Sequence, residues 1–326
     1  MTEVPETDAL SHKLVRHALA RAAYQDDTVR LVCSDLSDAD CLVTSRHGVF
    51  AVSRSGARLL IYGLFFGIAV DGCTLYLFEA CDKVRAGNNL GRIVRFRIED
   101  RQLKDPHILC KGLDNGCHQI AVINEELVVV DTYRQLLQRY DLSGQLIDQF
   151  DPVARAKADD SYAAVNVHMN SIGQLDDKIL LLLHRGNTMP AERSEILVFT
   201  TSFQFAERYG IDGYGCHDIV VLEDRTLLHC GSLDGELIGS NGLKRKISGT
   251  MTRGLAYDAR HLMIGASPFA ERGERMTLGG EVIYLDRDFQ RRGAVAVDGA
   301  PTGIVSLEKV LAFSTQCETI RVIDER

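Results

Sequence analysis

Polar residues stand directly before short apolar runs at regular places along the chain. Alignment of these runs on their first apolar residue defines a column two positions earlier, which we call the strand-start column. Its members are Asp40, Phe66, His118, Asn170, His217, Arg253 and Thr302. His168 lies two residues before Asn170, so in an extended strand both side chains point to the same side. Polar groups from well-separated segments would then meet at one place.

The chemistry that these residue types favour is metal-assisted catalysis. Imidazole suits zinc, iron, copper or nickel, and three neutral imidazoles with an open position match a site that activates water or polarises a carbonyl. We predict that a divalent transition metal (zinc or iron) is bound by His118, His168 and His217. Asn170 would donate a hydrogen bond to the substrate, and Arg253 would hold its carboxylate by two contacts. Alternatively, the same groups satisfy backbone atoms or hold water at a wet surface.

Other cysteines and histidines carry weaker signals. Cys117 and Cys216 each precede a column histidine in a Gly-Cys-His triplet, a pairing that suggests nucleophile chemistry. Strand alternation turns these thiols away from the histidine side, so we expect them to be buried. His184 and His229 fall on the second strand of their repeats, where we expect packing or turn roles.

A repeat of strand, tight polar turn and strand positions the column. Seven segments share this pattern: 41–53, 67–80, 119–132, 171–184, 218–231, 254–267 and 303–315. Two more short strands follow most copies. Repeated four-stranded antiparallel units are typical of an all-β fold, the β-propeller, and seven copies predict seven blades. Six blades remain if the first copy only decorates the last blade. Residues 28–34 would supply the outer strand that closes the ring and removes its open edges.

The domain organisation that follows is an N-terminal helix over 1–27 and a propeller over 28–326. The helix has an apolar stripe for packing on the domain or on a second subunit, made of Leu10, Leu14, Val15, Ala18, Leu19 and Ala22. Two long insertions, 151–170 and 267–281, are expected to lie as flaps near the mouth that carries the column.

Composition restricts the partners and the compartment. A net charge of −8 argues against nucleic acid and anionic membranes, and no stretch has the apolar length of a membrane span. Nine cysteines without CxxC pairs and no secretory signal predict reduced thiols in the cytoplasm. The expected partners are a small-molecule substrate and, through the helix, a second copy of the chain.

Segments 118–141, 167–187 and 249–267 resemble an uncharacterised bacterial family of propellers with strand starts of the forms H-x-[IL]-A, H-x-N-[GS]-[IL] and [TS]-R-G-L. The resemblance implies a propeller and points to His118, His168, Asn170 and Arg253, but it supplies no activity. A looser likeness links the histidines to peptidylglycine amidating lyases, which bind metal through histidines of separate blades. Carotenoid oxygenases use four such histidines, whereas gluconolactonase-like enzymes use Glu, Asn and Asp. These latter likenesses are fold-level analogies.

Two classes of function follow from these observations. The first is a metal-dependent lyase or hydrolase that acts on a small anionic or carbonyl-containing substrate at the channel mouth. The second is a non-catalytic propeller that binds a peptide, a glycan or a partner protein. A metal held by the three histidines would separate the two.

Overall fold

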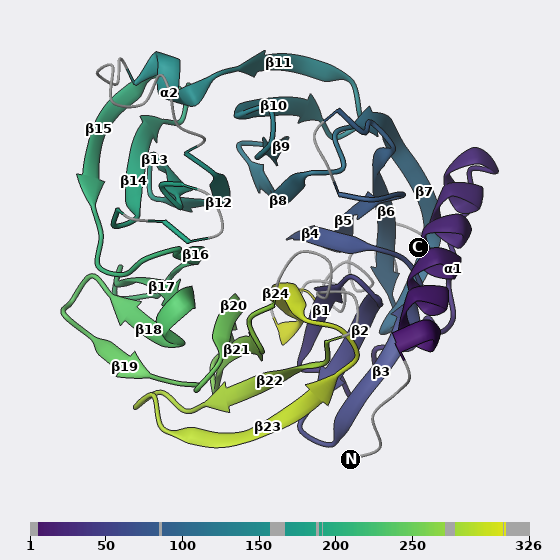
Figure 1. Cartoon of the computed structure of the whole chain (residues 1–326). Helices are drawn as coiled ribbons and strands as arrows, with labels where there is room; N and C mark the ends of the chain where they lie inside the picture. The colour runs from purple at the N-terminus through teal and green to yellow at the C-terminus, as the bar shows by residue number, and fades with distance from the viewer. Residues whose placement is uncertain are drawn as a thin grey trace, which may run out of the picture.

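The computed structural model describes residues 6–84, 87–156, 167–186, 189–190, 192–270, 278–308 and 310, with side chains from Lys13 onward. Within these ranges the strands form six sheets of four antiparallel strands, arranged as the blades of a propeller around one axis (Figure 1). The prediction of an all-β propeller is confirmed, and the prediction of seven blades is wrong.

The blades are numbered one to six in the order in which their innermost strands occur in the chain. From the innermost strand outward, blades one to three are β4 (Phe65–Asp71), β5 (Thr74–Ala80), β6 (Gly91–Glu99), β7 (Gln102–Leu113); β8 (Cys117–Ile123), β9 (Glu126–Asp131), β10 (Leu136–Asp141), β11 (Leu146–Phe150); and β12 (Met169–Leu175), β13 (Lys178–Leu183), β14 (Glu195–Thr200), β15 (Phe205–Gly210). Blades four to six are β16 (His217–Val221), β17 (Leu227–Gly231), β18 (Glu236–Gly239), β19 (Lys244–Lys246); β20 (Met251–Tyr257), β21 (Leu262–Ser267), β22 (Gly280–Leu285), β23 (Arg291–Val297); and β24 (Pro301–Ser306), β1 (Cys41–Ser45), β2 (Gly48–Ser53), β3 (Gly56–Ile61). Short helical turns, α2 (Pro152–Arg155) and η1 (Ser232–Asp234), connect some of the strands.

The sixth blade joins the two ends of the propeller, and this explains the wrong blade count. Its innermost strand, β24, comes from the end of the described chain and pairs with β1, with Leu42 opposite Val305. The first sequence repeat is therefore not a blade start but the second and third strands of this blade. Residues 28–34 do not supply a missing strand either. They run along the outer edge of β3, where Leu31 bridges Ile61.

Strands inside the blades are apolar on both faces because each sheet is covered by its two neighbours. In β5, Leu75 and Leu77 pack into the cluster shared with blade six, whereas Tyr76 and Phe78 pack into the cluster shared with blade two. A strand that is buried on both faces reads as a continuous apolar run. This packing accounts for the runs that made the repeat visible in the sequence.

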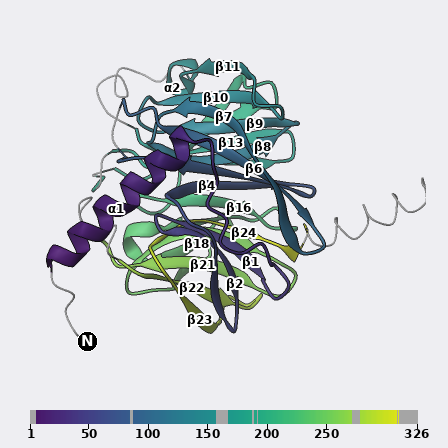
Figure 2. The ribbon, with the colours of Figure 1, turned by 90° about the vertical axis from the view of Figure 1, so that its right-hand side faces the viewer.

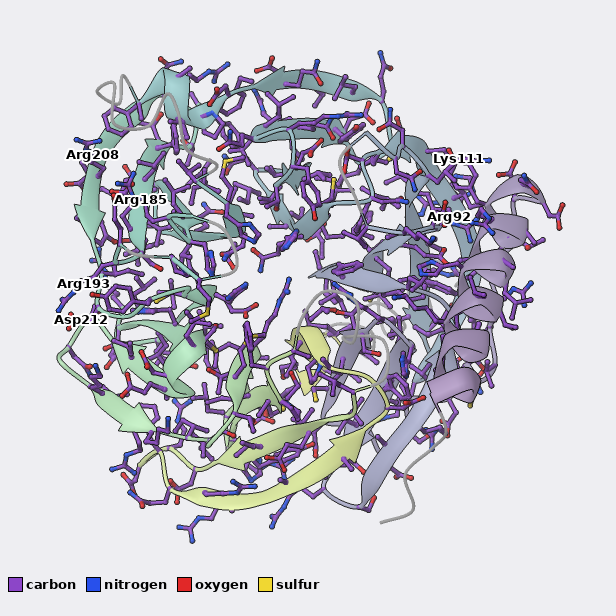
Figure 3. The ribbon with its side chains drawn as sticks, in the orientation of Figure 1. Arg92, Lys111, Arg185, Arg193, Arg208 and Asp212 are labelled. Carbon is purple, nitrogen blue, oxygen red and sulfur yellow. The ribbon has the colours of Figure 1, made fainter. Side chains whose placement is uncertain are left out.

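Helix α1 (Glu6–Gln25) lies along the outside of the ring near β7 and β3 (Figure 1), and runs obliquely across that side of the propeller (Figure 2). Among its described side chains, His17, Ala20 and Ala23 are buried, whereas Leu14, Val15 and Ala18 of the predicted stripe are exposed. The predicted packing face is therefore wrong over Leu14, Val15 and Ala18. Small residues allow the helix backbone to approach blade one, where Arg92 on β6 and Lys111 on β7 reach its last turn (Figure 3). A homodimer through α1 stays a prediction.

The cysteines within the described ranges are free thiols. Five of these thiols are buried, namely those of Cys41, Cys81, Cys117, Cys216 and Cys230. Cys317 lies outside the described residues, as do residues 157–166 and 271–277 of the two predicted flaps. In the part of the chain that the structure describes, no helix combines the length and the apolarity that crossing a membrane requires.

Candidate functional site

A small cavity on the propeller axis gathers most of the strand-start column. Six of its members line this cavity, each from a different innermost strand: Phe66, His118, Asn170, His217, Arg253 and Thr302. The cavity measures about 30 Å³, which is room for about two water molecules. Apolar side chains one step deeper form its floor: Ile68, Ile219, Leu255 and Ile304.

Every innermost strand has a register irregularity at this level. The pairing of β8 with β9 skips His118, that of β12 with β13 skips Asn170, and that of β20 with β21 skips Arg253. The other three innermost strands are interrupted at the same level. A β-bulge leaves the extra residue without a cross-strand partner and redirects its side chain. The bulges redirect His118, Asn170 and Arg253 towards the axis. In blade four the bulged residue is Asp218, and His217 stays paired with Cys230.

Asp40 does not belong to this ring. It precedes β1, which is a second strand and runs antiparallel to β24, so that Cys41 lies opposite Ser306 at the far end of the blade from Thr302. The Asp40 carbonyl accepts a hydrogen bond from the backbone of Leu307. The prediction that Asp40 lies at the same channel mouth is corrected, because the repeat that contains it is not an innermost strand.

Four histidines form a continuous row beside the cavity. The ring centroids of His118 and His168 are 5.0 Å apart, those of His168 and His184 are 4.8 Å apart, and those of His184 and His217 are 5.4 Å apart. His184, which the sequence suggested only as a packing or turn residue, thus stands between two predicted site residues. It directly follows β13, whose antiparallel pairing with β12 brings it beside His168. The sequence signal that could have identified His184 is its position at the end of the second strand of its repeat.

The two Gly-Cys-His triplets fix the tautomer of their histidines. His118 Nδ1 lies 2.7 Å from the carbonyl oxygen of Gly116, and His217 Nδ1 lies 2.9 Å from that of Gly215. A carbonyl oxygen can only accept a hydrogen bond, so Nδ1 carries the proton and Nε2 keeps its lone pair. Burial, reinforced by the charge of Arg253, holds the pKa of His118 and of His217 well below its usual range. Both imidazoles are therefore neutral bases.

Glycine is needed at the first position of these triplets. A Cβ atom at Gly116 would lie 1.5 Å from the Tyr133 ring, and Gly215 has a φ of 59°. The intervening cysteines are fully buried, and burial raises the pKa of Cys216 to about 12 and that of Cys117 well above its usual range. A reactive Cys–His pair is not supported at either triplet, because a buried thiol of high pKa carries little thiolate.

An acidic residue that the sequence analysis missed lies beside Arg253. The Asp218 carboxylate lines the cavity and accepts a hydrogen bond of 2.7 Å from the backbone of Gly254. Burial raises the pKa of Asp218, whereas the nearby charge of Arg253 opposes this rise. Simple alternation after His217 would turn Asp218 away from the axis. The bulge and its φ of 58° bring it to the cavity instead.

Asn170 has an unused acceptor beside the cavity. Its side-chain Nδ2 donates a hydrogen bond of 2.9 Å to the carbonyl of Cys216, whereas its buried Oδ1 has no partner within the described residues. Because Nδ2 carries a second hydrogen, the predicted donor role of Asn170 stays a prediction.

Phe66 packs beside His118 at a centroid distance of 6.2 Å, and the Thr302 hydroxyl bonds to the neighbouring strands through Thr44 and Phe65.

The residues do not form a ready metal site. Across the described ranges no group of three His, Cys, Asp or Glu side chains is spaced to hold a metal ion. The histidines contact one another in sequence along a row instead of gathering about one point, as a tetrahedral ion with bonds of about 2.1 Å requires. Binding of zinc or iron by His118, His168 and His217 stays a prediction.

Comparisons with known proteins identify the fold class. No family model matches the chain, and no curated protein matches it in sequence. A chain in a crystal structure of the nidogen–laminin complex matches with a TM-score of 0.56 at 10% identity, over 81% of this chain and 97% of that one. A Bacteroides caccae protein of unknown function matches with a TM-score of 0.54 at 10% identity, over the same shares of 81% and 97%.

The periplasmic gluconolactonase of Pseudomonas aeruginosa matches with a TM-score of 0.51 at 12% identity, over 81% of this chain and 97% of that one. These likenesses show a propeller fold that is shared with an enzyme and with a chain of a protein complex. At such identities they show the fold alone. The resemblance to an uncharacterised bacterial family has no support from the family comparison.

Proposed function

We propose that this protein is an enzyme of the lyase or hydrolase type that acts on a small anionic or carbonyl-containing substrate at the axial cavity. One observation carries the proposal. Two histidines with protonated Nδ1 and unprotonated Nε2 line the same cavity as the partly buried Arg253. A neutral imidazole can serve as a general base at neutral pH, and a guanidinium binds a carboxylate through two parallel hydrogen bonds.

Arg253 has two roles in this proposal. Burial lowers the pKa of His118 and of His217, and the charge of Arg253 lowers it further. Arg253 also orients the substrate anion. The base then removes a proton, from the carbon next to the carbonyl in a lyase or from water in a hydrolase. His168 and His184 continue the row of rings and support the position of His118 and His217.

The cavity size restricts what reaches the floor. A volume of about 30 Å³ admits one polar group of a substrate, and the remainder of the molecule must lie towards the mouth. Apolar residues beneath keep that group away from bulk water, which strengthens its electrostatic interactions with the protein.

The proposal is tested with two probe reactions that do not require the natural substrate. Exchange of deuterium from solvent into the methyl group of pyruvate, followed by NMR, reports proton abstraction, and hydrolysis of p-nitrophenyl acetate reports water activation. We expect the protein to accelerate one of them and the double variant His118→Gln/His217→Gln to lose roughly 100-fold of that rate, as loss of a general base does. His107→Gln, a change at an exposed histidine on β7, is the matched control.

Binding of the anion is measured separately by calorimetry with pyruvate. Arg253→Met is expected to weaken binding by at least about tenfold, as loss of a charge-assisted contact does. If neither probe reaction exceeds the buffer rate and Arg253→Met binds pyruvate like the parent, the enzyme proposal fails. In that case a non-catalytic propeller is the better description. Elemental analysis of the same samples tests the metal prediction, which requires about one ion per chain that His217→Ala loses.

A further inference from the structure

We infer that the group of the substrate that enters the axial cavity is a protonated amine, and that the substrate is an amino-acid-like zwitterion whose carboxylate lies against Arg253. This inference rests on the proposed function and narrows its substrate class, and it gives His118 and His217 a binding role that precedes the removal of a proton by one of them. It is carried by three hydrogen-bond acceptors on residues of neighbouring blades that line the same cavity.

The three acceptors are Nε2 of His118 on blade two, Oδ1 of Asn170 on blade three and Nε2 of His217 on blade four. Each acceptor is identified by the other polar atom of the same side chain, which donates a hydrogen bond. The two Nδ1 atoms donate to glycine carbonyls, and Asn170 Nδ2 donates to the Cys216 carbonyl. Within the described part of the chain, none of the three acceptors has a hydrogen-bond partner of its own.

The donor count of a ligand decides what fits this set. An ammonium group carries three donors and no acceptor, which matches three acceptors. A hydroxyl offers one donor and would leave acceptors unsatisfied, at a cost in binding. A carboxylate has acceptors only, so these three groups repel it. Because an ammonium is close to a water molecule in size, it fits a cavity of about 30 Å³.

Charge balance agrees with a zwitterion. Arg253 and Asp218 both line the cavity, so that an acidic side chain accompanies the guanidinium there. The polar wall is thus divided into acceptors on blades two to four and a guanidinium from blade five. A substrate with an ammonium and a carboxylate on one carbon presents both charges within a few ångströms, as this division requires. The hydrogen bonds involved need about 2.7–3.2 Å and not the tighter convergence of a metal ion.

The test compares three ligands of one size by calorimetry at pH 7.5: alanine, lactate and propionate. They differ only in an ammonium, a hydroxyl or a hydrogen on the carbon next to the carboxylate. We expect alanine to bind at least about tenfold more tightly than propionate, with lactate between them. Asn170→Leu should reduce the ratio of alanine to propionate affinity several-fold and leave propionate unchanged. Gln149→Leu, an amide-to-leucine change on outer strand β11, should preserve the ratio.

Unchanged propionate binding by Asn170→Leu guards against a simple folding defect, because a misfolded variant would lose both ligands. Equal binding of alanine and propionate would overturn the inference and leave the proposed anion site standing. Absence of binding for all three ligands, together with unchanged pyruvate binding in Arg253→Met, would remove the proposed function itself. Stoichiometric zinc that prevents alanine binding would overturn the inference in favour of a metal.

Discussion

A histidine becomes a base or a cation according to the group bonded to its second nitrogen. In both Gly-Cys-His triplets that group is the carbonyl two residues earlier, so a short local sequence selects one tautomer at two blades. Ser232 adds a second acceptor, 2.9 Å from His217 Nδ1. The cysteine between glycine and histidine points into the interior and serves as a small packing residue.

The neutral state of these imidazoles predicts how stability depends on pH. The pKa of His118 and that of His217 lie below the ordinary value of 6.5 because burial disfavours the charged ring. Below pH 6.5 the unfolded chain therefore binds protons that the folded chain does not, and the free energy of unfolding falls as the pH falls. Each histidine contributes up to roughly 1.4 kcal/mol per pH unit. Urea unfolding between pH 5 and 7.5 should show a shallower dependence for His118→Gln/His217→Gln than for the parent.

Asp131 acts in the opposite direction, since burial raises its pKa to about 6. It is present in both proteins, and its contribution cancels in the difference. Parallel pH dependences in parent and double variant would mean that these imidazoles are not buried and neutral.

The outer helix is an example of an element that is held by one buried polar contact. Arg92 on β6 is fully buried, pairs with Glu79 on β5 and donates hydrogen bonds to the carbonyls of Ala23 and Thr28. It therefore joins the first blade to the C-terminal end of α1 and to the segment that follows. Carbonyls at a helix end lack partners within the helix, and a guanidinium supplies several donors at once.

Removal of one partner of this pair should be costly. Arg92→Met leaves Glu79 buried without its cation and removes one donor from the carbonyls of Ala23 and Thr28, which should lower the free energy of unfolding by about 3–5 kcal/mol. Urea unfolding followed by circular dichroism measures the change. Lys111→Met is the matched control, because the ammonium of Lys111 is more exposed and pairs with Asp27 at the surface. We expect it to cost at most about 1 kcal/mol.

The double variant Arg92→Met/Glu79→Leu removes the uncompensated charge and should recover part of the loss. A cost of Arg92→Met no larger than that of Lys111→Met would show that the buried pair does not hold the helix.

The propeller as a whole depends on pairing between strands from opposite ends of the described chain. β24 and β1 lie side by side and close the ring. Closure removes the free edges that a row of sheets would otherwise expose. It also surrounds the axis completely, so that each of the six innermost strands contributes a residue to the cavity.

A covalent link across this closure should stabilise the ring. Cys41 lies opposite Ser306, and directly opposed residues of an antiparallel pair have the Cα separation that a disulfide needs. Ser306→Cys under oxidising conditions should therefore form a bond that encloses almost the whole propeller. It should raise the free energy of unfolding by about 2–4 kcal/mol, measured as the difference between oxidised and reduced samples.

Val305→Cys is the control, because position 305 lies opposite Leu42 instead of Cys41. Mass spectrometry verifies the disulfide. A bond that forms at position 306 without raising the unfolding temperature would indicate that opening between β24 and β1 does not limit stability.

Local periodicity was sufficient to predict part of this protein. The alternation of apolar residues and the polar turns depend on neighbours a few positions apart, so the repeat, the propeller class and six members of the strand-start column could be read in advance. The column identified His118 and Asn170 because both lie two positions before the first apolar residue of their strand. The column also included Asp40, which follows the same local pattern but precedes β1, the second strand of its blade and not the innermost one.

Contacts between distant residues decided the rest. The number of blades depends on the pairing of β24 with β1, and His184 reaches the histidine row only through its hairpin with β12. Asp218 enters the cavity through a bulge that local alternation does not predict, and α1 packs through His17 and its alanines because blade one offers them space. These features depend on which surfaces meet after the chain has folded. The spacing of apolar residues along the sequence does not specify which surfaces meet.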